Sequence, residues 1–248
     1  MSNIDYKKFF LSIIKKSESF DSFRDNKISS ELEIIGKYIE SKKGVFTVLV
    51  TLSFYKSVHP NQDIRYHQSN MKNGFSGRSF DTRFVTPNLK ELGFPSMSES
   101  GWLTRSLEQP YPYNFDYDGK LGPVREPFLK IIDYLQKNSD KSEDVLKTLL
   151  NYGWKIKKKN KIKIVPLKDS ENLSIDSITD SLNKFFNKNY NISGGSKLPV
   201  ICFHSIFQIL INEIERYNDC SLKSLGYHTT SDRTSKSSGD IEIYKTKN

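Results

Sequence analysis

The chain has 248 residues and a formal net charge of +9, a length that suits one large domain or one domain with a sizeable insertion. No stretch approaches the roughly 18 consecutive apolar residues of a membrane span, and the first residues lack the continuous apolar region of a secretory signal. Two cysteines, Cys202 and Cys220, leave no material for a disulfide framework or a cysteine zinc site. The composition therefore predicts a cytoplasmic protein without a membrane partner.

The charge balance is basic, with a pI of about 9.3. Basic side chains favour a polyanionic partner, because they neutralise phosphates and release counterions. The alternative is that the charge has no partner, since sequences rich in Lys, Asn and Ile are commonly basic. The charge therefore leaves two interpretations open: a nucleic-acid partner, or a basic surface that has no polyanionic partner.

The first part of the chain is predicted to be mainly helical, because apolar residues recur at helical spacing and Pro87 suits a first helical turn. The predicted helices cover residues 4–16, 30–41, 86–92, 101–107, 124–137 and 142–152. Residues 44–58, GVFTVLVTLSFYKSV, form a buried strand or a buried helix, which periodicity does not separate in a continuous apolar run.

The later part of the chain mixes predicted strands and helices. Residues 153–167, GWKIKKKNKIKIVPL, alternate apolar and basic residues and predict a basic β-hairpin. Residues 174–190 predict an amphipathic helix, and residues 200–217 an almost wholly apolar helix at the centre of the core. Residues 240–244, DIEIY, alternate like a strand.

The alternation in DIEIY places Asp240 and Glu242 on one face of the predicted strand. A carboxylate at the head of a strand is a good ligand for Mg²⁺, which prefers oxygen. The other interpretation is a polar edge strand whose acidic residues face water. The preceding helix would complete a two-carboxylate metal site if it delivered Glu213 next to Asp240; alternatively, Glu213 and Glu215 are solvated charges at a helix end.

Two basic features differ in kind. The predicted hairpin carries lysines that neutralise phosphates without reading sequence, among them Lys157, Lys159 and Lys161; the alternative is a solubilising edge that resists strand pairing. The arginines Arg78, Arg83 and Arg105 lie instead among Ser, Thr, Asn, Gln and aromatic residues, where Arg can pair bidentately with guanine. Acidic neighbours such as Asp81 indicate that part of this segment is paired internally.

The histidines give weaker indications. His204 is predicted to be a hydrogen-bonded core residue, and His59 and His67 lack the spacing of zinc ligands. His228 opens HTTSDRTSKSSGD, a loop of hydroxyls and charges that contains Arg233. The loop is a candidate to hold phosphate or to orient a metal ligand; the alternative is a generic polar loop.

Three stretches together point to a known family: GFSGRSFDTRFVTPNLKELGFPSMSESGWLTRSLEQPYPY, then SGGSKLPV, then HTTSDRTSKSSGDIEIY. They resemble bacterial type II restriction endonucleases of the SacI-like group, over about residues 59–244. Such enzymes are similar to the wider PD-(D/E)xK nuclease class, with a mixed sheet flanked by helices. The resemblance implies Mg²⁺-dependent cleavage of both strands of double-stranded DNA, usually by a homodimer, and a cognate DNA methyltransferase in the same system.

By that resemblance Asp240 matches the first metal-binding Asp of the class. We assign Asp240 and Glu242 as catalytic candidates and Asp240 and Glu213 as metal ligands. The (D/E)xK of the class normally follows on the next strand. Glu242 and Lys245 are three residues apart and therefore on opposite faces of a strand, so they do not replace it. The expectation is that the chain is the N-terminal part of a longer nuclease.

The expected fold is α/β or α+β. Residues 1–135 form a mainly helical DNA-recognition part, and residues 136–248 the basic hairpin and the beginning of a nuclease core. The expected function is that of a type II restriction endonuclease, inactive or incomplete as this chain. One alternative is a non-catalytic DNA-binding protein that retains the recognition region. Another is a subunit whose missing strand comes from a separate polypeptide.

Overall fold

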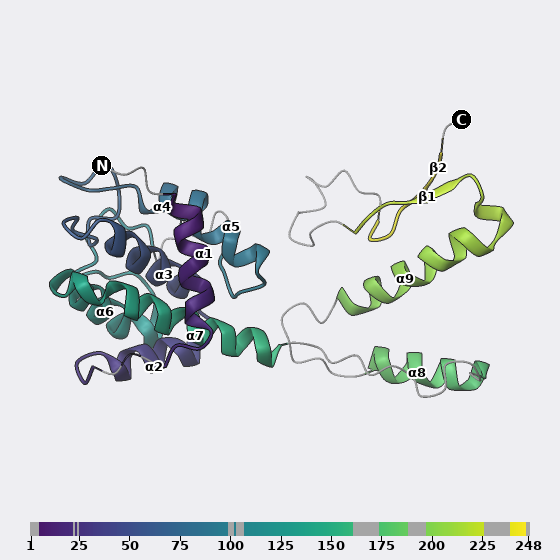
Figure 1. The fold of residues 1–248 in the computed structure, drawn as a ribbon, viewed down its shortest axis with the longest axis horizontal. Coiled ribbons are helices and arrows are strands. Elements are labelled where there is room, and N and C mark those ends of the chain that lie inside the picture. Colours follow the sequence, from purple (N-terminus) through teal and green to yellow (C-terminus); the bar gives the residue numbers. More distant parts are fainter. Residues whose placement is uncertain are drawn as a thin grey trace. The chain divides into compact units, whose positions relative to one another are not determined.

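The structure is a computed structural model. It describes residues 5–21, 23, 25–98, 102, 107–160, 174–187, 197–225 and 239–246. The described residues are mostly helical, with one small antiparallel sheet of two strands. The chain divides into two compact units, Met1–Lys161 and Ile162–Asn248, and each is described by itself (Figure 1).

The first unit is a helical assembly. Its longer helices are α1 (Tyr6–Ser17), α2 (Ser29–Tyr38), α3 (Lys43–Val58), α6 (Arg125–Lys137) and α7 (Ser142–Lys159). Shorter segments are α4 (Gly77–Phe80), the π-helix η1 (Asp81–Val85), α5 (Thr86–Glu91) and the 3-10 turns η3 (Gly122–Val124) and η4 (Ser139–Lys141). These elements confirm the helices predicted over residues 4–16, 30–41, 86–92 and 124–137. The helix predicted over 101–107 lies mostly outside the described residues.

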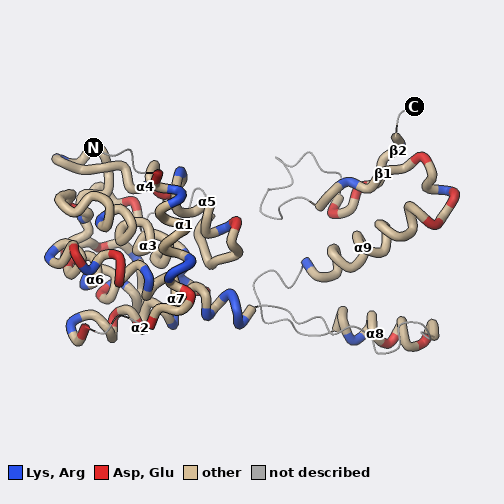
Figure 2. The backbone as a smooth tube through the Cα atoms, in the orientation of Figure 1, with Lys and Arg blue, Asp and Glu red and all other residues tan. Residues whose placement is uncertain are grey.

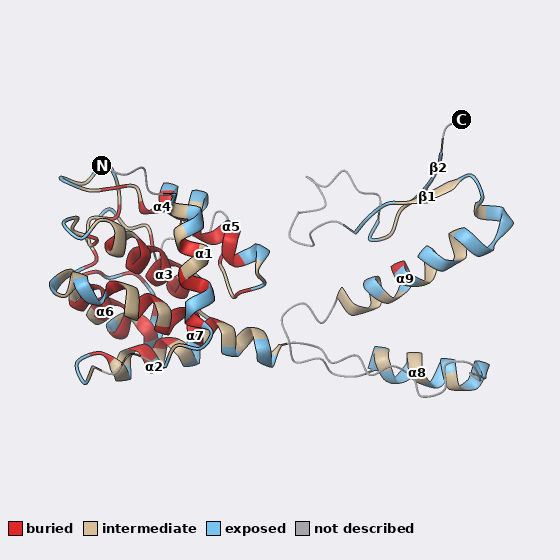
Figure 3. Cartoon of the chain, viewed as in Figure 1, coloured by how far each residue is buried: buried red, intermediate tan, exposed pale blue. Residues whose placement is uncertain are grey.

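Helix α3 is the centre of the first unit. Every residue from Val45 to Phe54 is buried, and both α6 and α7 pack against it. The apolar run of residues 44–58 is therefore a buried helix rather than a strand. Its length decides this, because strands rarely exceed about eight residues. Figure 3 shows the buried residues gathered in α3, α6 and α7.

A lysine at the end of α3 is buried with its ammonium satisfied. Lys56 is 1% exposed, and its Nζ donates to the carbonyl of Gln62 at 2.8 Å and to the side-chain oxygen of Gln136 at 3.0 Å. Burial lowers the pKa of this ammonium. These hydrogen bonds offset the cost of burying the charge and tie α3 to α6.

The predicted basic β-hairpin is wrong over residues 153–159, which continue helix α7. Gly153 is buried, and Trp154 and Ile156 pack against the core. They extend the buried face that Leu149 and Leu150 begin, so tertiary packing overrides the local alternation of apolar and basic residues. Residues 161–167 lie outside the described part of the chain. The predicted boundary after residue 135 assigns α7 to the second part, whereas in the structure α7 packs on α3.

The second unit contains α8 (Ile175–Asn187), α9 (Leu198–Glu213), the 3-10 turn η7 (Glu215–Tyr217), β1 (Cys220–Leu222) and β2 (Ile243–Lys245). The strands pair antiparallel, with Cys220 opposite Lys245 and Leu222 opposite Ile243, and α9 packs on β1. Helix α9 was expected at the centre of the core, but His204 is its only buried residue, and Ile209 is 64% exposed. The described residues do not surround this helix.

None of the described helices combines the length and apolar character needed to cross a membrane.

The close approach of α7 to Phe94 depends on Gly153. A Cβ atom at Gly153 would lie 2.7 Å from Cδ1 of Phe94, whose ring packs edge-on against Trp154. We expect Gly153→Ala to lower the free energy of unfolding by about 1–3 kcal/mol through overpacking, despite the better helix propensity of Ala. Urea denaturation measures this, with exposed Lys155→Ala on the same helix as control. Equal stability of Gly153→Ala and wild type would contradict the packing.

Candidate nucleic-acid interface

A continuous helical segment, α4–η1–α5, presents a polar and basic outer face. Its exposed residues include Arg78, Ser79, Thr82 and Arg83, followed by Pro87, Lys90 and Glu91 in α5. Phe80, Val85 and Leu89 are buried in the core. The predicted Arg78 and Arg83 are thus placed on one exposed helical segment. Figure 2 shows where basic and acidic residues lie along the backbone of each unit. Guanidinium and hydroxyl groups on one surface are donors that suit phosphate oxygens and base edges.

The arginines that the structure describes in the first unit fall into two groups. Arg65 forms an ion pair with Asp63 at 2.6 Å, and Arg125 donates to the carbonyl oxygens of Tyr117 and Phe115. These two arginines are used internally. Arg78 and Arg83, by contrast, form no side-chain hydrogen bond or ion pair with the described residues, so their donors face solvent.

The turn Asp81–Val85, which contains Arg83, is a π-helix. The N–H of Thr86 donates to the carbonyl of Asp81, five residues earlier. A regular α-helix would place Thr86 on the exposed face, because it lies four residues after Thr82 and seven after Ser79. Thr86 is instead fully buried. The extra residue in the turn has rotated it into the core, as π-bulges do.

Asp81 holds that turn from the inside. Its carboxylate is 1% exposed and accepts hydrogen bonds from two hydroxyls. The Thr86 hydroxyl lies 2.9 Å from both carboxylate oxygens, and that of Thr51 on α3 lies 3.0 Å from one. Burial raises the pKa of Asp81 to about 6, against the lowering effect of the hydrogen bonds from Thr86 and Thr51. Asp81 is therefore satisfied inside the segment by hydroxyls, and not by pairing with an arginine among the described residues.

The C-terminal end of α7 is the second basic feature. The ammonium of Lys157 lies 4.7 Å from the ring centroid of Trp154 and 5.7 Å from that of Phe94. Lys159 pairs with Glu40 at 3.5 Å, and Lys158 with Glu18 at 3.2 Å. These exposed pairs contribute little stability, so a polyanion can compete for the lysines. Phe94 follows α5 directly and thereby connects this end of α7 to the arginine-bearing segment.

The other predicted DNA-binding residues, Arg105, Lys161 and Arg233, lie outside the described residues.

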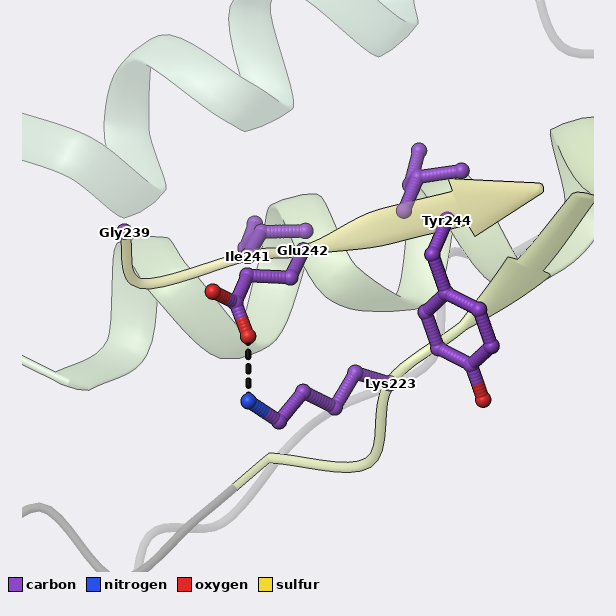
Figure 4. A pocket seen from close by; sticks show the side chains of 6 residues that line it. Lys223, Gly239, Ile241, Glu242 and Tyr244 are labelled. Atoms are coloured by element: carbon purple, nitrogen blue, oxygen red, sulfur yellow. Dashed lines mark hydrogen bonds and ion pairs between the residues drawn. The ribbon is translucent and has the colours of Figure 1, made fainter. Parts of the chain in front are cut away.

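The predicted metal site lies in the second unit, on the two-stranded sheet. Asp240 is exposed and precedes β2. The carboxylate of Glu242 forms an ion pair with the ammonium of Lys223 across the strands, beside an open groove that Gly239, Ile241 and Tyr244 also line (Figure 4). Asp240 therefore has an exposed carboxylate, whereas the carboxylate of Glu242, two residues later, is paired with the ammonium of Lys223.

The structure does not bring Glu213 to Asp240. His204 Nε2 lies 3.0 Å from the carbonyl of Lys223, which confirms His204 as a buried, hydrogen-bonded residue. This contact sets Lys223, and its partner Glu242, beside the middle of α9. Glu213 lies nine residues further along the helix, about 13 Å at the usual rise. It is exposed at the helix end.

The residues fit Mg²⁺ poorly as far as the structure describes them. Among the described residues, no three His, Cys, Asp or Glu side chains lie close enough together to hold a metal ion. Asp240 offers one exposed carboxylate, and Mg²⁺ requires octahedral oxygen coordination, usually with more than one anionic ligand. No chemical step through a metal is therefore derived from this geometry.

Two buried polar arrangements were not predicted from the sequence. Besides the Asp81 turn, the His67 ring stacks on Tyr113 with centroids 3.8 Å apart, and burial lowers the pKa of His67 to about 4. The burial of Asp81 had one signal in the sequence, because Asp81 lies between the apolar residues Phe80 and Phe84.

The chain matches no protein-family model, and a search of curated proteins found no similar sequence. What this surface does is therefore inferred from its residues.

The raised pKa of Asp81 gives stability a pH dependence with a defined sign. The folded state binds this proton more tightly than the unfolded chain, whose Asp pKa is 3.8. The corresponding stabilisation is complete below that value and is lost as pH rises through about 6. We expect the unfolding free energy of wild type, relative to Asp81→Asn, to fall by roughly 3 kcal/mol between acidic and neutral pH.

Urea denaturation of both proteins across that pH range measures the difference. The comparison cancels the titration of other carboxyl groups, such as Asp25 and Asp63, because they are present in both proteins. A difference that is constant with pH would show that Asp81 does not titrate in this range.

Proposed function

We propose that the chain binds double-stranded DNA through its first unit and belongs to a restriction-type endonuclease. The observation that carries the proposal is the outer face of Gly77–Glu91. There, Arg78 and Arg83 present guanidinium groups that no described residue neutralises, beside the hydroxyls of Ser79 and Thr82.

The surroundings of this face support a polyanion as the ligand. The net charge of the chain is +9, and the basic end of α7 lies on the same unit, next to Phe94. Lysines there supply phosphate contacts, which hold a protein in register on a duplex, while arginines also reach base edges. The two kinds of contact together are what sequence-specific DNA binding requires.

The endonuclease part of the proposal rests on the resemblance of residues 74–113, 193–200 and 228–244 to the SacI-like group. In this proposal Asp240 is a Mg²⁺ ligand, and Glu242 joins it once released from Lys223. The proposal also includes further metal ligands beyond these two carboxylates and a homodimer of the chain. It further includes a cognate DNA methyltransferase in the same restriction system. The mixed-sheet nuclease core also belongs to it.

The alternative is a DNA-binding protein without catalysis. The ion pair between Lys223 and Glu242 favours this alternative, because it occupies one of the two carboxylates with a cation of the protein itself.

The arginine face is tested by duplex binding. We expect Arg78→Ala/Arg83→Ala to weaken binding of a labelled duplex at least about tenfold, and to reduce the slope of log affinity against log salt by about 2. Fluorescence anisotropy over a range of salt concentrations gives both quantities.

The matched control is Lys27→Ala/Lys37→Ala, which removes two exposed charges near and on helix α2. It changes the net charge equally, so equal weakening by both double variants would mean that the arginines contribute only general charge. No weakening by the arginine variant would reject this face as the interface.

Catalysis is tested separately on plasmid DNA with Mg²⁺. We expect Asp240→Ala to abolish any Mg²⁺-dependent cleavage and to bind duplex as tightly as wild type in EDTA, because Asp240 lies outside the first unit. Discrete products that are the same for wild type and variant would exclude Asp240 from the reaction. Intact salt-dependent binding without cleavage by wild type would favour the non-catalytic alternative.

A further inference from the structure

The buried pair Asp81–Thr86 lies directly beneath the exposed arginines. Arg78 is three residues before Asp81, and Arg83 is inside the π-helical turn that Asp81 begins. Two contacts close this turn: the N–H of Thr86 donates to the carbonyl of Asp81, and the hydroxyl of Thr86 donates to its carboxylate. Both link the same two residues, five positions apart.

The spacing of Arg78 and Arg83 makes their relative direction sensitive to this turn. Residues five apart in a regular α-helix diverge by about 140° around the axis. A wider turn needs more residues per revolution, so it reduces that divergence. Relaxation of the turn to a regular α-helix would separate the two guanidinium groups. It would also rotate the following residues by about 100°, the angle of one residue, and expose Thr86.

The position of the segment is fixed independently of the turn. The aromatic ring of Phe80 packs on Phe54 of α3 and on Tyr6 of α1, and Phe84 also packs on Tyr6. Thr51 adds a hydrogen bond from α3 to the Asp81 carboxylate, from outside the segment. The chain therefore separates two roles: Thr51 anchors Asp81 to the core, and Thr86 shapes the turn.

We propose that Asp81 is a positioning residue for DNA binding, which through Thr86 maintains the π-helical turn that directs Arg78 and Arg83 toward one duplex. This inference rests on the proposed function and adds to it the residue that sets the geometry of the interface. Asp81 touches no DNA in this arrangement, and its effect passes entirely through the two arginines.

The test is a double-mutant cycle on duplex affinity, measured by fluorescence anisotropy at low salt. Thr86→Val removes the hydroxyl that closes the turn and keeps the shape of the side chain. We expect it to weaken binding by roughly five- to tenfold, the size of one typical net hydrogen bond. In the Arg78→Ala/Arg83→Ala background, the same substitution is expected to have no further effect, since non-additivity marks residues that act as one unit.

Two variants on the same carboxylate serve as controls. Thr51→Val removes the other hydroxyl donor to Asp81 but leaves the turn, so we expect it to lower stability and to keep wild-type affinity. Thr86→Ser retains the hydroxyl and is expected to restore affinity. Circular dichroism checks that Thr86→Val folds. If it does not, Thr86→Ala, which removes the same hydroxyl, is used in its place.

The outcomes separate the inference from the proposed function. Equal weakening by Thr86→Val with and without the arginines would overturn the positioning role, while leaving the arginine face in place. Weakening by Thr51→Val to the same extent as Thr86→Val would also overturn it, because loss of stability alone would then explain both. If the arginine variant itself binds like wild type, the proposed interface fails and the inference fails with it.

Discussion

The first unit depends on the burial of helix α3. An apolar helix that is buried on all sides cannot be left in water, so α6 and α7 must pack around it. Their packing fixes the positions of everything attached to them. Polar groups on α3 then acquire specific partners, because a buried polar group without a hydrogen bond is costly. Thr51 meets Asp81, and Lys56 meets Gln136. The same burial that stabilises the unit thus dictates where its polar contacts form.

The two units differ in how far their described residues bury apolar surface. The first has a continuous core of Phe, Ile, Leu and Val side chains from all its longer helices. In the second, Ile209 and Phe203 of α9 are exposed, and the sheet has two strands of three residues. Positions in the first unit are therefore held by many contacts. The geometry around Asp240 is held by few, chiefly the ladder between β1 and β2 and the contact of His204 with Lys223.

The sequence was sufficient to locate most helices, because their apolar residues recur at helical spacing. It failed where local pattern and tertiary packing disagree. The alternation after Gly153 resembles a strand, but Trp154 and Ile156 complete a buried helical face, which only the position of α3 reveals. The exposure of Arg78 and Arg83 agreed with their polar neighbours, whereas the π-helical turn left no periodic signal. Its first residue, Asp81, is anchored by a hydroxyl from Thr51, 30 residues away, and no local pattern connects the two. For Glu213 the obstacle is distance along a helix, since no local pattern sets which part of α9 the neighbouring strand lies against.

The stacking of Lys157 over Trp154 gives the protein an optical property. The indole of Trp154 is held in place by a hydrogen bond from its Nε1 to the carbonyl of Ile14 at 3.2 Å, with a positive charge above its ring. The chain has two tryptophans, and the other, Trp102, is 1% exposed. Indole emission responds to charge close to the ring, so a ligand that draws the lysine away changes the fluorescence of one tryptophan and leaves the other as an internal reference. The basic end of α7 can thus be observed without attaching a dye.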